Sequence, residues 1–499
     1  MQSIKKQITE LIANKGVVIT IGLGTTGKSV VEYFCSNGVD VIAIEKLSRE
    51  QFVTNSSNLK FLQNYEQKNG TSMHKATFCF EDKVSESVQK KILQLSEQKA
   101  PIVAVISPGI SKNSQTASKI RSFNVPIIGE LELALSLVDV PVVMVTGSNG
   151  KSTTVSIIDQ ILKASSIDSF LCGNIGQPVL EVLKAKKTPD VLVVEASSYQ
   201  LETANSIRPK VAVYLNISPN HLERHGTIEN YHAAKMKIFA NQTKDDIAIL
   251  NFDDPKVIAA SKTISSAVSV FGFDNQHDPE FKNHSLVNFK PDANKDTIEI
   301  KFNGKSKSFD CSKSLLIGVH TRLNMAAAIL ASLSVGASDD GINKVIASFG
   351  GLVHRLQKVP TKSGLFAIND SKSTTVASTV AAYDSIRKNF PSSPICLLVG
   401  GKMKIGSWLP LASAIHSNQS TFMTRVICFG GDGAIILQEL ENHGIIASLA
   451  RNVSEAVSLA CDWIRENEIV LFSPGCASFD EFSNFEQRGD VFIRLIKER

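Results

Sequence analysis

The sequence predicts an α/β protein that is built on parallel sheets and divided into about three domains. The first observation is the length of 499 residues, because a domain typically holds about 150 residues. The second is a series of short apolar runs, each followed by Gly, Asn or Ser and then by a helical pattern. Continuous apolar strands that alternate with helices are typical of parallel sheets covered on both faces. The runs are residues 17–22, 102–107, 142–147, 191–196, 211–218, 247–252, 395–401, 426–431 and 469–473.

The domain boundaries follow from changes in composition between these runs. A new strand-loop-helix unit begins after the helical segment 129–139, and a third unit begins near residue 350. We therefore expect domains at 1–129, 130–351 and 352–499. Residues 48–100 are polar with only weak strand patterns, and they suggest no function. Residues 272–312 are predicted to form a small β excursion, because TIEIKF (297–302) alternates in polarity.

Composition excludes several classes of protein. The net charge of +5 over this length is too small to indicate nucleic acid or an anionic membrane as the main partner. No apolar run approaches the roughly 20 residues that a bilayer requires. The eight cysteines lie far apart and form no C-x-x-C pair, which favours reduced core thiols over a disulfide framework or a zinc site. We expect a cytoplasmic enzyme that acts as a monomer.

Two glycine-rich loops are candidates for binding a nucleotide. GLGTTGKS (22–29) satisfies both G-x-x-x-x-G-K-S and G-x-G-x-x-G, whereas VTGSNGKSTT (145–154) has Val145 where the first pattern requires glycine. The pattern alone would therefore assign ATP to the first loop.

The residues downstream reverse that assignment. A site that cleaves a triphosphate needs a lysine on the terminal phosphates, a hydroxyl on Mg²⁺ and an acidic metal ligand at the end of a nearby strand. After the second loop, Glu195 ends such a strand. After the first loop, the next strand ends at Glu45, which has the spacing of an acid that meets a ribose hydroxyl. The second loop is therefore predicted to bind ATP, and the first to hold the diphosphate of a nucleotide-linked substrate.

Further motifs, in order along the chain, resemble the Mur ligase superfamily. TGSNGKST is followed by GNIG (173–176), EASSYQL (195–201), LNISPNHLERHG (215–226) and YHAAKMKI (231–238). The motifs SPGI, HR, NDSKSTT, GGKMK and SPGCASFDEFSNFEQRG resemble the branch of that superfamily that adds D-glutamate; they lie at 107–110, 354–355, 369–375, 400–404 and 473–489. The resemblance implies a Rossmann-like UDP-binding domain, a central P-loop ATPase-like parallel-sheet domain and a C-terminal Rossmann-like domain.

The resemblance also implies an activity. This branch adds D-glutamate to UDP-N-acetylmuramoyl-L-alanine through an acyl phosphate, releasing ADP and phosphate, in the synthesis of peptidoglycan precursors. The expected cofactors are ATP and two Mg²⁺ ions, with a lysine carbamylated by CO₂ at Lys235. The expected catalytic residues are Lys151, Glu195, His221 and Lys235, and the expected metal ligands are Ser152, Glu195, His221 and Lys235.

The resemblance also implies which residues of this chain bind the substrates, at the positions that match the motifs of the family. Those expected to bind ATP are Gly147, Ser148, Asn149, Gly150, Lys151, Ser152, Thr153, Asn251 and Arg355. Those expected to bind the UDP substrate are Gly22, Leu23, Gly24, Thr25, Thr26, Gly27, Glu45, Ser107, Pro108, Gly109 and Asn174. Those expected to bind the amino acid are Thr374, Lys404, Ser478, Phe479 and Phe485, with Asp370 and Lys372 nearby.

One position departs from the branch. Residue 483 is Ser, where relatives commonly carry a lysine between two aromatic residues, and Lys402 is a candidate for the missing cation. We expect D-glutamate to remain the substrate, with weaker apparent affinity.

Alternative interpretations remain at this stage. The chain could be another Mur-type ligase or a folylpolyglutamate-type ligase, since the latter share the central ATP domain. A nucleotide-sugar-binding protein without catalysis is disfavoured by the presence of Lys151, Glu195, His221 and Lys235 together. A dehydrogenase that uses GLGTTG would need a nicotinamide site, and the sequence contains no sign of one.

Overall fold

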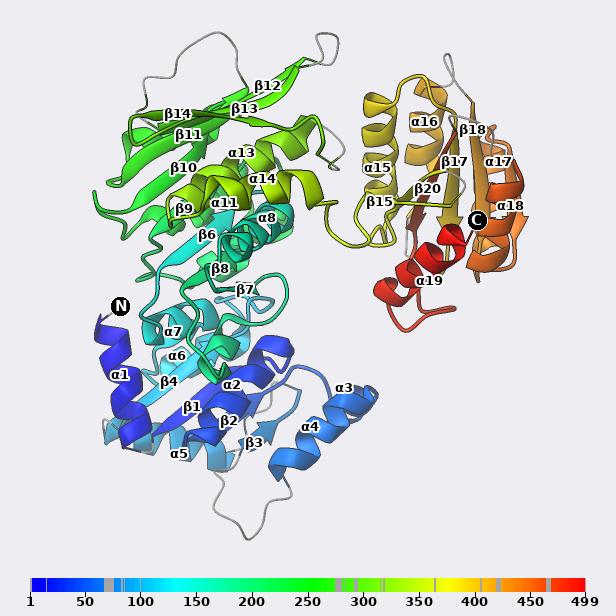
Figure 1. Cartoon of the computed structure of the whole chain (residues 1–499). Helices are drawn as coiled ribbons and strands as arrows, with labels where there is room; N and C mark the ends of the chain where they lie inside the picture. The colour runs from blue at the N-terminus through cyan, green and yellow to red at the C-terminus, as the bar shows by residue number, and fades with distance from the viewer. Residues whose placement is uncertain are drawn as a thin grey trace. The chain divides into compact units, whose positions relative to one another are not determined.

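The computed structural model describes most of the chain and divides it into two compact units. The described residues are 2–14, 16–66, 76–81, 84, 86–98, 100–273, 281, 283–290, 295–314, 316, 319–362, 365–403, 406–418, 423–463 and 468–498. Unit 1 comprises residues 1–310 and 323–345, and unit 2 comprises residues 311–322 and 346–499. The strands form a 5-stranded and a 9-stranded sheet in unit 1 and a 6-stranded sheet in unit 2 (Figure 1).

The first sheet is wholly parallel, with strand order β3-β2-β1-β4-β5. Its central strands are fully buried because apolar side chains occupy both faces. Helices α1, α2 and α7 cover one face, and α5 and α6 cover the other. Its strands are β1 (Val17–Ile21), β2 (Asp40–Ile44), β3 (Ala76–Cys79), β4 (Ile102–Ile106) and β5 (Ile127–Gly129). The helices up to α7 are α1 (Gln2–Ala13), α2 (Thr25–Ser36), α3 (Arg49–Val53), α4 (Ser56–Glu66), α5 (Glu86–Glu97), α6 (Gln115–Ser122) and α7 (Glu130–Leu137).

The second sheet has the order β14-β13-β12-β11-β10-β9-β6-β8-β7. Its strands are parallel up to β12, and β13 and β14 then join antiparallel. The expected β excursion at 272–312 is therefore an extension of this sheet. The strands are β6 (Val142–Thr146), β7 (Ser169–Gly173), β8 (Val191–Glu195), β9 (Val211–Tyr214), β10 (Ile247–Asn251), β11 (Ala267–Phe273), β12 (Asn283–Lys290), β13 (Lys295–Phe302) and β14 (Lys305–Asp310).

Helices lie between the strands of the second sheet, and two further helices, α13 and α14, follow its last strand. The α-helices are α8 (Lys151–Ala164), α9 (Ser198–Leu201), α10 (Leu222–His225), α11 (Ile228–Met236), α12 (Pro255–Ile258), α13 (Val319–Leu333) and α14 (Asp339–Ser348). The 3₁₀ helices are η1 (Val179–Lys184), η2 (Lys237–Phe239) and η3 (Ala259–Lys262). Strands β6, β8 and β9 are adjacent and parallel, so the loops that follow them emerge at one edge of the sheet.

The third sheet has the order β15-β16-β20-β17-β18-β19, parallel except for β15. Helices α15, α16 and α17 cover one face, and α18 and α19 cover the other. Its strands are β15 (Gln357–Val359), β16 (Phe366–Asn369), β17 (Ile395–Gly400), β18 (Thr424–Phe429), β19 (Ala447–Ala450) and β20 (Ile469–Gly475). The helices are α15 (Val376–Asn389), α16 (Leu409–Asn418), α17 (Gly433–Asn442), α18 (Val453–Trp463) and α19 (Phe485–Lys497).

The structure confirms the predicted α/β class, and every apolar run named above coincides with a strand. The polar region 48–100, where the sequence showed only weak strand patterns, is in its described part mainly the helices α3, α4 and α5 with one short strand. The domain limits 1–129, 130–351 and 352–499 stay a prediction.

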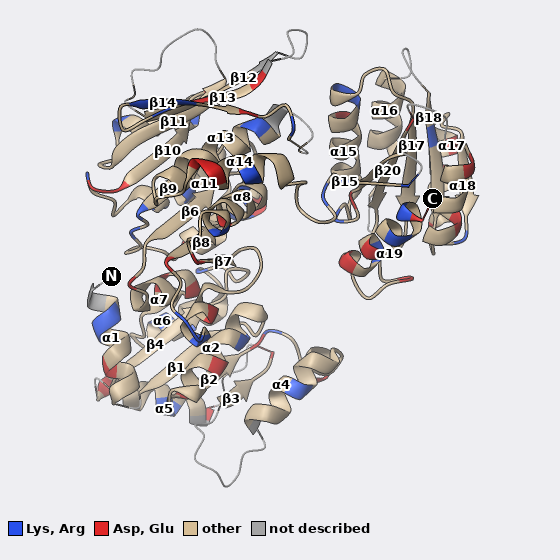
Figure 2. Cartoon of the chain, viewed as in Figure 1, with Lys and Arg blue, Asp and Glu red and all other residues tan. Residues whose placement is uncertain are grey.

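Basic and acidic residues are interspersed over both units (Figure 2), consistent with the small net charge. No helix within the described residues is both long and apolar enough to cross a membrane. All eight cysteines are described, and none of them forms a disulfide.

Candidate functional site

The loop between β6 and α8 has a backbone that requires glycine at two positions. Gly147 has φ +154° and Gly150 has φ +83°, both in the region that L side chains rarely adopt. A Cβ on Gly150 would lie 2.4 Å from Oδ1 of Asn324. The loop turns sharply into the N-terminus of α8, which leaves backbone N–H groups at a helix end suited to phosphate.

The side chain of Asn216, just after β9, holds this loop in place. The backbone N–H of Asn149 donates to Asn216 Oδ1 at 2.9 Å, and Asn216 Nδ2 donates to the Asn149 carbonyl at 3.1 Å. The backbone N–H of Ser148 donates to the Asn216 carbonyl at 2.9 Å. Sequence analysis did not single out Asn216, although it lies within LNIS directly after a strand.

We predict that Asn216→Ala weakens ATP binding without unfolding the protein. The substitution removes both hydrogen bonds between the side chain and Asn149, each worth about 0.5–1.5 kcal/mol, so the KM for ATP should rise about tenfold. Initial rates over a range of ATP concentrations measure this, with the melting temperature as the control. An unchanged KM for ATP would show that the loop keeps its shape without Asn216.

Lys151 folds back over its own loop. Its Nζ donates to the carbonyls of Gly147 and Ser148 at 2.9 Å each. Its predicted contact with a terminal phosphate stays a prediction. Ser152 and Thr153 follow in the first turn of α8, and both are half-buried.

Glu195, at the end of β8, has a carboxylate that is only half satisfied. The side chain is 2 % exposed, and Oε1 accepts from Asn174 Nδ2 at 2.7 Å. Oε2 is buried without a hydrogen-bond partner among the described residues. A buried carboxylate oxygen in that state fits a cation ligand. Asn174, predicted to touch the UDP substrate, is placed here against Glu195.

Lys235, on α11, is buried against the same loop. It is 1 % exposed, and its Nζ donates to the Gly147 carbonyl at 2.8 Å. Burial, and then the neighbouring Lys151, lower the pKa of Lys235 to about 7, against the opposing effect of Glu195. The amine is therefore largely neutral at slightly alkaline pH, which is the form that reacts with CO₂.

His221 lies in the loop after β9 and begins α10 with φ +55°. Its ring lies beside Tyr199 with centroids 4.9 Å apart, and Nδ1 is 3.5 Å from the Glu223 carboxylate. In the part of the chain that the structure describes, no direct contact joins His221 to Glu195 or Lys235. His225 and His232 contact Ser198 Oγ and the Tyr214 hydroxyl respectively.

Asn251, at the end of β10, forms hydrogen bonds with the backbone through both the nitrogen and the oxygen of its side-chain amide. Nδ2 donates to the Leu215 carbonyl at 2.8 Å, and Oδ1 accepts from the Asp253 N–H at 2.9 Å. Its predicted contact with ATP stays a prediction.

The first glycine-rich loop, between β1 and α2, is built differently. Gly22 has φ +92°, and a Cβ on Gly27 would lie 1.8 Å from the Gly22 carbonyl. Glu45 Oε2 accepts from the Leu23 N–H at 2.7 Å, and Ser107 Oγ donates to the Gly22 carbonyl at 3.1 Å. The loop thus brings together the predicted UDP-substrate residues around Gly22, Glu45 and Ser107.

Lys28 and Ser29 of this first loop form hydrogen bonds with neighbouring side chains, and Lys28 also lies close to two aromatic rings. Lys28 Nζ donates to Asn58 Oδ1 and lies 5.7 and 5.5 Å from the ring centres of Phe52 and Phe61. Ser29 Oγ donates to Glu181. Phe52 belongs to α3, and Asn58 and Phe61 belong to α4, two helices in a region for which the sequence suggested no function. These contacts favour the second loop as the ATP loop.

Comparison with known proteins gives the family. The Mur ligase middle domain model matches residues 145–332. The D-glutamate ligase of Geotalea daltonii, UDP-N-acetylmuramoylalanine–D-glutamate ligase, is 32 % identical over 481 residues, covering 96 % of this chain and 97 % of its own. The same-named ligase of Buchnera aphidicola is 33 % identical and covers 96 % of this chain and 98 % of its own. The chain belongs to the Mur ligase family.

Solved Mur ligases share its fold. MurF of Acinetobacter baumannii matches with a TM-score of 0.57 and 16 % identity, covering 95 % of this chain and 93 % of its own. MurC of Thermotoga maritima matches with a TM-score of 0.54 and 16 % identity, covering 96 % and 98 %. As a Mur ligase, the protein is an ATP-dependent enzyme that forms amide bonds, and this confirms the class of enzyme expected from its motifs.

In unit 2 of this Mur ligase, the HR motif lies in a strained turn. His354 and Leu356 have φ +63° and +41°, and Arg355 lies between them. His354 is buried beside Asn369, with Nδ1 2.9 Å from the amide nitrogen. Positive φ at two residues that are not glycine is costly and is often found at functional sites. The predicted contact of Arg355 with ATP stays a prediction.

The NDSK motif follows β16 and joins the final block of the Mur ligase. Asp370 accepts from the Leu356 N–H at 3.1 Å and from Ser473 Oγ at 2.8 Å, and burial raises its pKa to about 6. Arg488, 1 % exposed, donates to the carbonyls of Ser371 and Cys476 at 2.9 and 3.0 Å. The final block contains Arg488, but sequence reasoning gave it no role, since its partners are distant in sequence.

The residues predicted to bind the amino acid are only partly brought together. Ser478 is 2 % exposed, whereas Phe479 is 76 % exposed, and Phe485 begins α19 with its ring 5.9 Å from Lys372 Nζ. Thr374 lies in the segment between NDSK and α15. Lys404 lies outside the described residues. Lys402 donates to Asp432 at 3.1 Å, so an acidic side chain already occupies the candidate substitute for the missing cation.

Proposed function

We propose that this chain adds D-glutamate to UDP-N-acetylmuramoyl-L-alanine, using ATP, in peptidoglycan precursor synthesis. The observation that carries the proposal is the cluster formed by Lys151, Glu195 and Lys235. Lys151 and Lys235 donate to the glycine loop, both Lys151 and Glu195 influence the charge of Lys235, and one oxygen of Glu195 is buried without a partner among the described residues. The near full-length similarity to D-glutamate ligases supports the choice of amino acid.

The reaction proceeds in two balanced steps. A carboxylate oxygen of the UDP substrate attacks the γ-phosphorus of ATP, and ADP leaves, which yields an acyl phosphate. The amine of D-glutamate then attacks the acyl carbon, loses a proton and expels phosphate. Lys151 and the N-terminus of α8 orient the phosphates and balance their charge in both steps.

The donor set fits Mg²⁺. We propose Ser152, Glu195, His221 and carbamylated Lys235 as ligands of two ions, which would supply charge neutralisation of the phosphates and the carboxylate. The fit rests on the unpartnered Glu195 oxygen and on Lys235, whose pKa of about 7 leaves a neutral amine available to CO₂. The monomeric state and the cytoplasmic location belong to the same proposal.

Phosphate release tests the proposed substrates. With Mg²⁺ and ATP present, release should require both UDP-N-acetylmuramoyl-L-alanine and D-glutamate. L-Glutamate and neutral D-amino acids should give little release. Release with a neutral amino acid in preference to D-glutamate would show that the substrate assignment is wrong although the chain is a ligase.

We predict that Ser483→Lys lowers the KM for D-glutamate by less than tenfold. The substitution restores one partly exposed cation, and such an ion pair contributes about 0–1 kcal/mol. Lys404→Ala should raise the same KM far more, since it leaves a substrate carboxylate without its proposed cation. The KM for D-glutamate of both variants, with the KM for ATP as control, is the measurement; a Lys404→Ala variant with the wild-type KM contradicts the assignment of the site.

A further inference from the structure

One arginine ties the SPGI loop after β4 to the segment after β9. Arg224, on α10, donates from Nη1 to the Pro108 carbonyl at 2.9 Å and from Nη2 to the Ile110 carbonyl at 3.1 Å. The same guanidinium donates from Nε and Nη2 to Glu202, with a shortest distance of 2.8 Å. Both side chains are 13 % exposed, so this pair is largely shielded from solvent.

These contacts set the direction of the peptide groups in the loop. In a trans peptide the carbonyl and the following N–H point in opposite directions. The carbonyls of Pro108 and Ile110 face Arg224, so the N–H groups of Gly109 and Ser111 face away from it. Neither N–H has a hydrogen-bond partner among the described residues. Gly109 is exposed, and a Cβ there would meet nothing within 4 Å.

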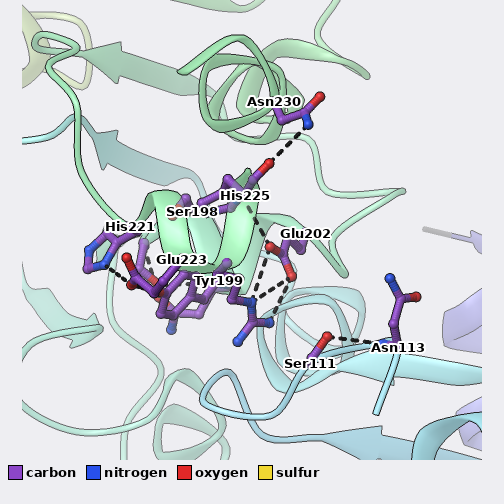
Figure 3. Close-up of polar contacts among 12 residues, drawn as sticks. Ser111, Asn113, Ser198, Tyr199, Glu202, His221, Glu223, His225 and Asn230 are labelled. Atoms are coloured by element: carbon purple, nitrogen blue, oxygen red, sulfur yellow. Dashed lines mark hydrogen bonds and ion pairs between the residues drawn. The ribbon is translucent and has the colours of Figure 1, made fainter. Parts of the chain in front are cut away.

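Arg224 also contacts Tyr199, whose ring lies beside the predicted metal ligand His221. His221 lies three residues before Arg224, and Glu202 lies seven residues after Glu195. Tyr199 packs its ring 4.2 Å from the Arg224 guanidinium carbon, and its hydroxyl is 3.2 Å from Glu223. Figure 3 shows Tyr199, Glu202, His221 and Glu223 gathered around the α10 turn, with Ser111 on the neighbouring loop.

We propose that Arg224, held by Glu202, is a positioning residue that presents the Gly109 and Ser111 N–H groups to the UDP substrate. The proposal rests on the proposed function, since the ligand of this loop is that substrate. By its contacts with Tyr199, the same side chain fixes the substrate loop relative to the turn that contains His221.

Lysine cannot replace arginine in this role. The planar guanidinium reaches two carbonyls and a carboxylate at once from fixed directions, whereas an ammonium is a single point donor. Arg224→Lys keeps the charge opposite Glu202 but releases at least one carbonyl of the loop. The substrate N–H groups then lose their fixed direction, while the ATP loop is untouched.

Calorimetric titration with UDP-N-acetylmuramoyl-L-alanine, without ATP or D-glutamate, tests the proposal. The Kd of Arg224→Lys should be about tenfold above that of wild type, because about one charge-assisted hydrogen bond in the loop is lost. The Kd for ADP with Mg²⁺ should stay within about twofold, because no hydrogen bond among the described residues joins the glycine loop at 147–150 to Arg224. Glu202→Gln should shift the Kd for the UDP substrate in the same direction by less, since it loosens the arginine without removing it.

Arg208→Lys is the matched control. Arg208 pairs with Asp246 at 2.7 Å elsewhere in unit 1, and its substitution should change neither Kd. An Arg224→Lys variant with wild-type affinity for the UDP substrate overturns the proposal. Equal loss of both affinities with a lowered melting temperature also overturns it, since Arg224 would then act on stability alone. Failure of the wild-type protein to bind the UDP substrate would instead contradict the proposed function.

Discussion

Lys151→Ala should abolish turnover, whereas Lys28→Ala should leave the KM for ATP nearly unchanged. Lys151 lies over the loop of Gly147 and Ser148, where the transferred phosphoryl group would rest. Loss of such a preorganised cation costs several kcal/mol of transition-state stabilisation, so kcat should fall at least about 10²–10³-fold. Lys28 is already held by Asn58, Phe52 and Phe61, and its loss should affect at most the UDP substrate and the packing of α3 and α4.

The two lysines form a matched pair because both follow glycine in a G-K-S sequence at the start of a helix. Steady-state kinetics and nucleotide binding on both variants give the comparison. If Lys28→Ala lost ATP binding while Lys151→Ala kept it, the assignment of the two loops would be reversed.

Lys235→Ala should bind ATP but form little acyl phosphate, lowering kcat by about two orders of magnitude or more, the effect expected when a charged group is lost from the reacting centre. Lys235→Glu should restore part of this activity, because it returns an oxygen ligand. Lys163→Ala is the control, since Lys163 is an exposed lysine on α8 paired with Asp159. Full activity in Lys235→Ala contradicts the role assigned to this side chain.

The pKa of Lys235 gives this prediction a pH dependence. Burial lowers the pKa to about 7, so the protonated form prevails below that pH and cannot attack CO₂. For enzyme depleted of CO₂, recovery at a fixed concentration of dissolved CO₂ should be about tenfold faster at pH 8 than at pH 6, and should level off above pH 8. An ordinary lysine would instead give a rise of about a hundredfold without levelling.

The sequence predicted those parts of the fold and site that depend on local patterns. Apolar runs located the strands, and residues just after them, such as Glu195, lie at the sheet edge where ligands collect. The assignment of ATP to the second loop rested on chemistry that a literal pattern match missed, and the engagement of Lys28 by α3 and α4 supports it.

The sequence could not predict contacts between residues that are distant along the chain. Arg224 meets Pro108 across 116 positions, and Arg488 meets Ser371 across 117. Both arginines lie within motifs named above, but those motifs do not indicate the distant partners. Asn216 clamps a loop that lies 67 positions earlier. Lys402 was a candidate to replace the cation that is missing at position 483. The sequence could not show that Asp432, 30 positions away, already pairs with Lys402.

The proposed acyl-phosphate mechanism is tested by following the transfer of oxygen from the substrate to the released phosphate. UDP-N-acetylmuramoyl-L-alanine labelled with ¹⁸O in the alanyl carboxylate is incubated with ATP, Mg²⁺ and D-glutamate, and the released phosphate is analysed by mass spectrometry. If the reaction proceeds through an acyl phosphate, each released phosphate should carry one oxygen from the labelled carboxylate, and its release should depend on D-glutamate. Unlabelled phosphate, or release that ignores D-glutamate, would contradict an acyl-phosphate ligase built on Lys151, Glu195 and Lys235.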